Sequence, residues 1–242
     1  MIEYAPPAQH RPQRPSHAAI RAHPERDRTG EAPAILAAGF VAHVGFVDHG
    51  RPVVIPMTYQ YAADEPRLLY LHGGVTGRLM GHLSTGAPVC VTVTELDGLV
   101  YSRTALNHSV NYRSVVAFAR AAATQPDLAE RERILAAMIA RHFPGRTAGR
   151  DYEPAPAAQL AATALVALEI EEWSAKVRSG GPNGPGDDDA TRPGTAGVVA
   201  PARAADPGAA VVRRATPRGG LPDPWERSVA GGPSVAWCGV RF

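Results

Sequence analysis

Apolar and polar positions alternate with a period of two through the first half of the chain, as expected for half-buried β-strands. Runs rich in β-branched and aromatic residues occupy 40–47, 53–61, 68–72, 89–94, 99–102 and 114–121. Turn-forming sequences separate these runs, among them Asp48-His49-Gly50 and Asp97-Gly98. The pattern therefore predicts a series of short antiparallel strands between residues 39 and 123.

Helical periodicity is confined to three segments. Short helices are expected at 34–38, ending at Gly39, and at 79–83, after a glycine-rich turn. The clearest helix is predicted at 126–143, where Leu135, Met138 and Ile139 share one face. A last strand is predicted at 162–169, running on into 170–178. Because strands and helices do not alternate as βαβ units, the pattern predicts a mainly β barrel or sandwich with a few helices.

Composition divides the chain into three parts. Residues 1–30 are polar and rich in Pro, Arg and His, and are expected to form a partly flexible N-terminal arm. Residues 31–178 carry the strand pattern and are expected to form the domain. From 180 to 233, 20 of 54 residues are Gly or Pro, so 179–242 is predicted to be a mostly disordered tail. Trp225 and Trp237 could fasten this tail to the domain.

Charge and cysteine usage exclude several classes of protein. The formal net charge is +2 with no long basic run, so no nucleic-acid partner is expected. No apolar stretch approaches the ~20 residues of a membrane span, and a cytoplasmic protein without a membrane partner is expected. The two cysteines make no disulfide framework, and the dispersed histidines predict no metal site. His43 lies within an apolar strand and is expected to be an interior residue.

Two clusters carry the chemistry of a phosphate site. The first is LYLHGGVTGRLMGHL at 69–83, in which Gly73, Gly77 and Arg78 follow a strand. Its spacing fits neither the dinucleotide fingerprint nor the P-loop, but glycine backbone and a guanidinium suit an anion. The second cluster is Asn111-Tyr112-Arg113-Ser114 at the start of a strand. Together they indicate a site for a dianion, the alternative being that both arginines are solvated surface residues.

Several motifs in order resemble the pyridoxamine 5'-phosphate oxidase-like FMN-binding proteins, and within them the flavin-nucleotide-binding branch related to nitroimidazole-resistance proteins. These motifs are HPER (23–26), AGFVAHVGFV (38–47), PVVIPMTY (52–59), LYLHG…GRLM (69–80), APVCVTVTELDGLV (87–100), NHSVNYRSVV (107–116) and SAKVR (174–178). The resemblance covers about residues 23–178. It implies an antiparallel split β-barrel that forms a homodimer, with FMN in a groove at the interface.

The resemblance also implies which residues hold the cofactor. Val54, Pro56, Met57, Thr58 and Tyr59 would run along the isoalloxazine, and His72, Gly73, Gly77, Arg78 and Leu79 would wrap the phosphate. Asn111, Tyr112, Arg113 and Ser114 would add phosphate contacts, from the partner chain if the site is shared. Lys176, the only lysine of the chain, would face the flavin or cap the domain.

The expected function is that of an FMN-dependent oxidoreductase acting on an unknown small molecule. The Arg-x-His motif that holds the substrate phosphate in pyridoxamine 5'-phosphate oxidases proper is missing, so no catalytic residue is assigned. Tyr59, His72 and Tyr112 are the candidate proton donors. A non-catalytic flavin-binding or carrier module and a haem- or deazaflavin-binding relative are the alternatives. A solvent-facing His43 or His108 beside a wide groove would favour haem.

Overall fold

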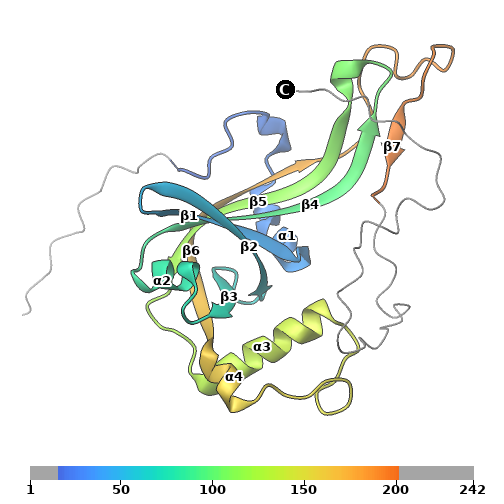
Figure 1. Ribbon diagram of the computed structural model, residues 1–242. Coiled ribbons are helices and arrows are strands. Elements are labelled where there is room, and N and C mark those ends of the chain that lie inside the picture. Colours follow the sequence, from blue (N-terminus) through green and yellow to red (C-terminus); the bar gives the residue numbers. More distant parts are fainter. Residues whose placement is uncertain (1–15, 202–242) are drawn as a thin grey trace, which may run out of the picture. The chain divides into compact units, whose positions relative to one another are not determined.

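The computed structural model describes residues 16–201, and its centre is one antiparallel sheet (Figure 1). The strands are β1 (Val41–Asp48), β2 (Arg51–Tyr61), β3 (Leu68–Gly74), β4 (Val89–Tyr101), β5 (Ser109–Ala121), β6 (Thr163–Arg178) and β7 (Gly197–Val199). They lie in the order β1-β2-β3-β6-β5-β4-β7, and β1 also pairs with β4. The first six strands therefore close into a barrel, which confirms the predicted mainly β, antiparallel architecture.

The alternation along each strand separates the core from the outer face of the barrel. On β1, Ala42, Val44 and Phe46 are buried, whereas Val41 and His43 point outward and are exposed. The prediction that His43 is an interior residue is therefore wrong, because its two strand neighbours occupy the inward positions. The interior is filled mainly by β-branched and aliphatic side chains from all six strands.

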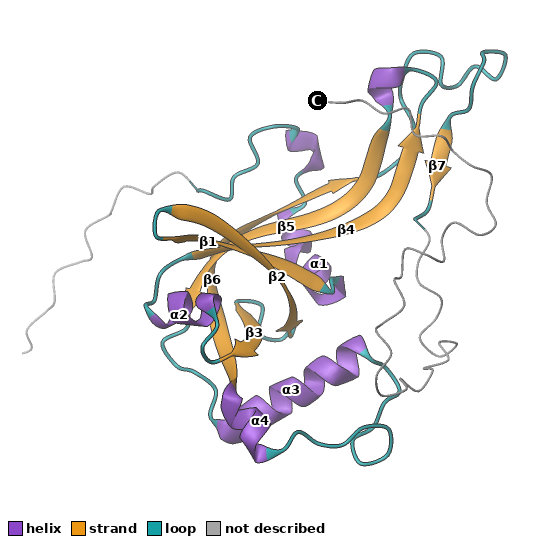
Figure 2. Ribbon diagram, in the orientation of Figure 1, coloured by secondary structure: helices purple, strands orange, loops and turns teal. Residues whose placement is uncertain are grey.

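Helices cover the ends and one side of the barrel (Figure 2). They are α1 (Ala32–Ala38), α2 (Arg78–Ser84), α3 (Leu128–His142) and α4 (Ala157–Ala162), with 3-10 turns at Pro24–Arg26, Thr29–Glu31 and Ala105–Asn107. The three predicted helices are confirmed as α1, α2 and α3. The sequence did not predict α4 or the 3-10 turns, since elements this short carry no clear periodicity. No helix among residues 16–201 is long and apolar enough to cross a membrane.

One predicted turn is a bulge instead. Asp97-Gly98 does not end a strand: β4 runs on to Tyr101, and its register with β5 shifts between Leu96 and Gly98. An aspartate–glycine pair favours a turn locally, but the neighbouring strand keeps the chain extended through a β-bulge. The long β4–β5 hairpin consequently extends beyond the barrel, with β7 beside it (Figure 1).

The segments flanking the barrel are ordered as far as the structure describes them. Asp187 accepts hydrogen bonds from Ser102 Oγ (3.0 Å) and from the backbone N–H of Arg103 (2.6 Å), and β7 pairs with β4. Residues 179–201, the described part of the predicted tail, thus contact the β4–β5 hairpin through Asp187 and β7. On the N-terminal side, Ser16 Oγ donates to Glu172. Trp225, Trp237 and the rest of 202–242 lie outside the described residues.

Tyr59 joins the barrel to the helices. Its side chain is fully buried, and its hydroxyl donates to the carbonyl of Leu36 in α1 at 2.6 Å. Arg141 of α3 lies over the Tyr59 ring, 4.8 Å from its centroid, and donates to the Tyr59 carbonyl at 3.0 Å. Burial raises the pKa of the Tyr59 hydroxyl to about 12, so it remains a donor throughout the physiological range.

Gly39, at the end of α1, leaves the space in which this contact forms. A Cβ at Gly39 would lie 2.6 Å from the Tyr59 hydroxyl oxygen and still closer to Val93 Cγ1. Gly39→Ala should therefore destabilise the protein by about 1–3 kcal/mol through overpacking. The matched control is Gly81→Ala in α2, where a Cβ meets nothing within 4 Å. This control should raise the free energy of unfolding by about 0.5–1 kcal/mol, and urea denaturation of both variants measures the difference. Equal stability of the two variants would contradict the packing described here.

Candidate functional site

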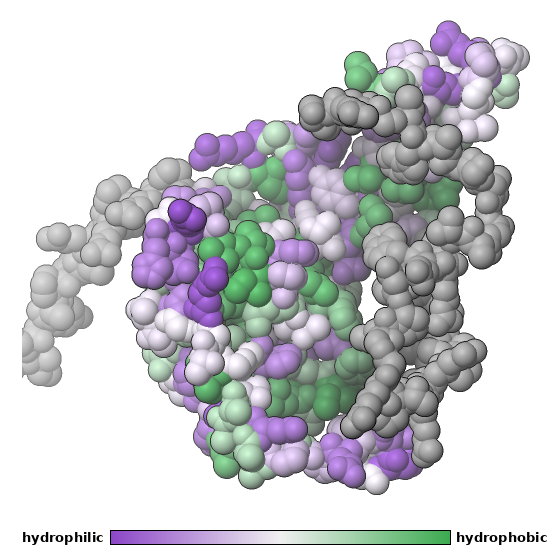
Figure 3. Space-filling model, in the orientation of Figure 1, coloured by the Kyte–Doolittle hydropathy of each residue, from purple (hydrophilic) through white to green (hydrophobic). Residues whose placement is uncertain are grey.

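The outer face of β2 carries part of the predicted cofactor set. Val54, Pro56 and Thr58 point outward, and the Val54 residue is 61% exposed. Met57 and Tyr59 alternate with them and point into the core. Figure 3 shows apolar side chains gathered over β1 and β2, and again between β2 and α3. Val54 and Pro56 thus present their side chains on one open surface, whereas Thr58 lines a cavity beside α3.

The glycine-rich turn after β3 places Arg78 at the surface. The Gly77 N–H donates to the carbonyl of Gly74 at 2.8 Å, and a Cβ on Gly77 would lie 2.9 Å from that oxygen. This close approach explains why glycine stands at 77. Arg78 begins α2 with a side chain 62% exposed, 3.6 Å from Asp48, whereas Leu79 is buried. Arg78 is therefore available to an anion at this end of the barrel.

The second predicted cluster makes its contacts within the chain. Arg113 forms a bidentate pair with Asp97 at 2.9 and 2.8 Å, and these hydrogen bonds raise its pKa above the ordinary value. Asn111 donates to the carbonyl of Gly180 at 3.0 Å and accepts from Arg178. The Ser114 hydroxyl donates to the backbone carbonyl of Lys176 at 3.3 Å.

Lys176 lies on the outer face beside the N-terminal segment. Its Nζ donates to the carbonyl of Ala22 at 3.0 Å, and its backbone forms an isolated bridge with Asp27. In the single chain, Lys176 therefore fastens residues 22–27 to β6.

The strand register keeps the two phosphate clusters apart in one chain. Cys90 lies opposite Gly45 and Thr94 lies opposite Ser114. Asp48, which Arg78 approaches, lies three residues further along β1 from Gly45. Seven residues of extended chain thus separate the level of Asp48 from that of Ser114, about 20 Å. Within one chain the two clusters therefore do not surround a single phosphate.

An apolar cavity of about 360 Å³, here called the α3 cavity, lies between the strands and α3. It brings together the predicted residues Thr58 and His72 with His142, Phe40 and mainly apolar side chains of α3 and α4. His72 Nδ1 is buried there and has no hydrogen-bond partner among the residues described. Burial lowers the pKa of His72 below its ordinary value, and that of His142 likewise. Both imidazoles are therefore held neutral.

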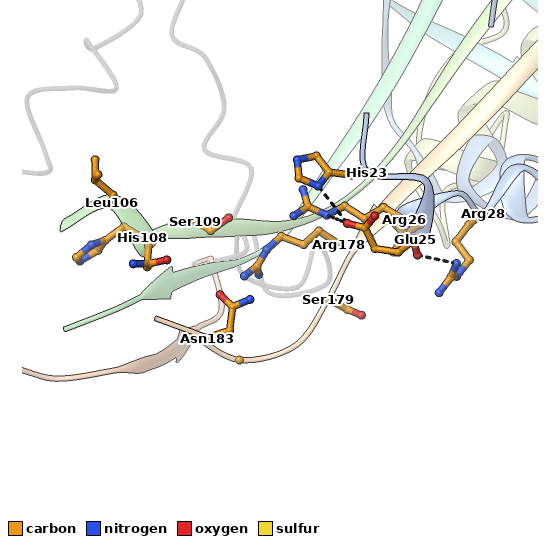
Figure 4. Close-up of a pocket in the computed structure, with 13 residues that line it drawn as sticks. His23, Glu25, Arg26, Arg28, Leu106, His108, Ser109, Arg178, Ser179 and Asn183 are labelled. Atoms are coloured by element: carbon orange, nitrogen blue, oxygen red, sulfur yellow. Dashed lines mark hydrogen bonds and ion pairs between the residues drawn. The ribbon is translucent and has the colours of Figure 1, made fainter. Parts of the chain in front are cut away.

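A larger cavity of about 610 Å³, here called the cationic cavity, lies beside residues 106–109 at the turn of the β4–β5 hairpin (Figure 4). Its charged and titratable lining residues are His23, Glu25, Arg26, Arg28, His108 and Arg178. The sequence singled out the HPER, NHS and SAKVR segments by resemblance but assigned no ligand to these residues. Only the fold brings the three segments to one place.

The closed antiparallel sheet with few helices is a split β-barrel. The model of the pyridoxamine 5'-phosphate oxidase family matches residues 28–177, and the chain belongs to that family.

Two solved structures are similar over most of the chain. The flavocytochrome Anf3 from Azotobacter vinelandii is 31% identical, covering 88% of this chain and 94% of its own, with a TM-score of 0.67. The FAD and haem binding protein from Mycobacterium smegmatis is 30% identical, covering 81% and 94%, with a TM-score of 0.61. No curated protein matches the chain.

The depressed pKa of His72 predicts a pH-dependent stability. Below the ordinary pKa of 6.5, the unfolded chain binds a proton that folded His72 resists, so stability falls as the pH falls. The free energy of unfolding should therefore decrease between pH 7 and pH 5.5, and His72→Gln should decrease less. His49→Gln, at a side chain 95% exposed, should retain the full dependence. Urea denaturation at both pH values measures this, and an identical loss in all three proteins would exclude His72 as its source.

Proposed function

We propose that the protein is a flavin-dependent oxidoreductase that acts on a small molecule, with the flavin lying on the outer face of β1 and β2. The observation that carries this proposal is the open apolar strip of Val54 and Pro56 ending at the polar Thr58, in a family fold that binds flavin. A flat apolar ring fits such a strip and leaves its polar edge to Thr58 and the strand backbone. Bound flavin supplies hydride or electron transfer, while the chain binds and orients it.

FMN is the proposed form of the cofactor, and a homodimer is the proposed assembly. Arg78 would be the main counter-charge of the phosphate, because an exposed guanidinium offers forked donors to a dianion. The separation of about 20 Å between the Arg78 and Ser114 levels supports a site shared between two chains. The outer face offers apolar surface to a second copy, since Val41, Val47 and Val54 are all exposed.

The visible spectrum of the purified protein tests the proposal. Flavin bands that are released on denaturation are expected, and mass spectrometry of the released cofactor distinguishes FMN from FAD. Anaerobic reduction by a nicotinamide cofactor would separate an enzyme from a carrier module. A protein that neither holds nor takes up flavin would contradict the proposal.

Arg78→Ala should weaken FMN binding about tenfold to hundredfold, since a hydrogen bond to a charged group contributes ~1.5–3 kcal/mol. Arg133→Ala is the control, because Arg133 is also an exposed arginine, paired only with Glu130 on α3 in the residues described. Fluorescence titration of the flavin-free protein measures both affinities. Equal affinities in the two variants would remove Arg78 from the phosphate site.

A second candidate function is that of a flavocytochrome, which also binds haem. The observation that favours it is the α3 cavity, an apolar site with an unpartnered, neutral imidazole nitrogen on His72. Neutral imidazole is the form of histidine that ligates haem iron, and apolar walls suit the porphyrin. Both similar structures carry a haem or cytochrome in their names, and His43 is exposed and His108 lines a wide cavity.

If His72 ligates the iron, protein titrated with hemin should develop a Soret band that His72→Ala loses. His49→Ala, an exposed histidine on the β1–β2 turn, should keep the band. Difference spectroscopy measures both. A His72→Ala protein with an unchanged Soret band would rule out His72 as the haem ligand. If that variant instead loses flavin binding but keeps the Soret band, His72 belongs to the flavin site.

A further inference from the structure

The cationic cavity is built from three segments that are far apart in the sequence. The 3-10 turn at Pro24–Arg26 forms one wall, residues 106–109 form the second, and the end of β6 with residues 179–183 forms the third. Figure 4 shows Arg178 between them, with His108 and Leu106 toward one end and Arg28 toward the other. The cavity is therefore a product of the fold rather than a run of surface arginines.

Positive charge exceeds negative charge in this cavity. Arg26, Arg28 and Arg178 line it, and Glu25 is its only lining carboxylate, although Arg28 also pairs at 3.8 Å with Glu31 outside the lining. Glu25 is already engaged by Arg26 at 3.5 Å and by the His23 ring at 3.1 Å. Among residues 16–201 no carboxylate pairs with Arg178, whose guanidinium donates to the amide oxygen of Asn111. At least one guanidinium is therefore held in place with donors left for a ligand.

Backbone and amide contacts position these groups. Arg28 donates to the carbonyls of Glu25 (3.2 Å) and Asp27 (2.7 Å). These bonds stabilise the 3-10 turn that forms the first wall of the cavity. Asn111 is buried, with 8% of its surface exposed, and its side-chain amide oxygen accepts a hydrogen bond from the Arg178 guanidinium. This contact holds Arg178 in position. Holding an arginine before the ligand arrives reduces the ordering cost of binding.

We propose that the cationic cavity binds the diphosphate of a nucleotide. The planar fork of arginine matches phosphate oxygens, and adjacent guanidiniums suit two linked phosphates better than one. A volume of about 610 Å³ lies within the range of small-molecule sites and exceeds the need of a bare phosphate. Ser109 and Asn183 offer hydrogen bonds to a ribose, and His108 with Leu106 offers a surface for the base.

Within one chain, this site lies apart from the proposed phosphate site at Arg78. Arg178 pairs with Tyr112, which lies opposite Leu96, whereas Arg78 approaches Asp48 at the other end of the barrel. One chain therefore cannot bring both arginines to the same phosphate. Two sources of a diphosphate fit the chemistry: the dinucleotide form of the flavin itself, or a separate nucleotide that meets the flavin.

Calorimetric titration of the full-length protein, freed of bound flavin, with inorganic pyrophosphate and with ADP tests the proposal. Both should bind, ADP more tightly, with an affinity that falls as salt rises. Arg178→Gln should weaken both about tenfold to hundredfold, and Arg178→Lys should retain part of the affinity because it keeps the charge. Arg26→Gln, which leaves the Asn111 contact intact, should also weaken them. The control Arg133→Gln makes the same change of charge on α3 and should bind as the parent does.

The outcomes separate this inference from the proposed function. No binding of pyrophosphate or ADP to the flavin-free protein, or equal affinity in Arg178→Gln, Arg26→Gln and Arg133→Gln, would overturn it even if the protein holds flavin. If Arg178→Gln weakens FAD but not FMN in titrations of flavin-free protein, the diphosphate is that of the flavin. If it weakens ADP while both flavins bind as before, the site serves a separate nucleotide.

Discussion

Closure of the sheet through β1 is the constraint on which the rest of the structure depends. Because β1 pairs with β2 on one side and with β4 on the other, no sheet edge is left in the six-stranded barrel. Closure also gives every strand an inside and an outside. Ala42 and Val44 enter the core while His43 is turned out, and the same alternation turns Val54, Pro56 and Thr58 outward on β2. The same alternation of side chains along β1 and β2 thus produces both the core and the candidate flavin surface.

Tyr59 and Arg141 then determine what covers the outside. The buried phenol binds α1 through the Leu36 carbonyl, and Arg141 ties α3 to the carbonyls of Tyr59 and Leu36. With α3 held there, the outward positions Thr58 and His72 no longer face solvent but a mainly apolar cavity. The low dielectric of that cavity is what keeps the His72 imidazole neutral.

The barrel also acts as a spacer between charged surfaces. Arg78 stands near the β1–β2 turn, while Arg26, Arg28 and Arg178 line the cationic cavity beside the turn of the extended β4–β5 hairpin. An extended strand rises by about 3.3 Å per residue. Residues several positions apart along the strands are therefore separated by more than the width of a phosphate group.

The sequence by itself determined the class of the fold and several of its elements. Period-two runs predicted the strands, and 126–143 predicted α3, because local patterning decides which residues can be buried. The same locality misled at Asp97-Gly98, where a turn signal became a bulge once β5 paired alongside. Only the tertiary structure decided that Arg113 pairs with Asp97, that His72 lies beneath α3, and that HPER and SAKVR share a cavity. Such pairings depend on which strands become neighbours, and strand neighbourhood is set by closure of the sheet, which no local pattern encodes.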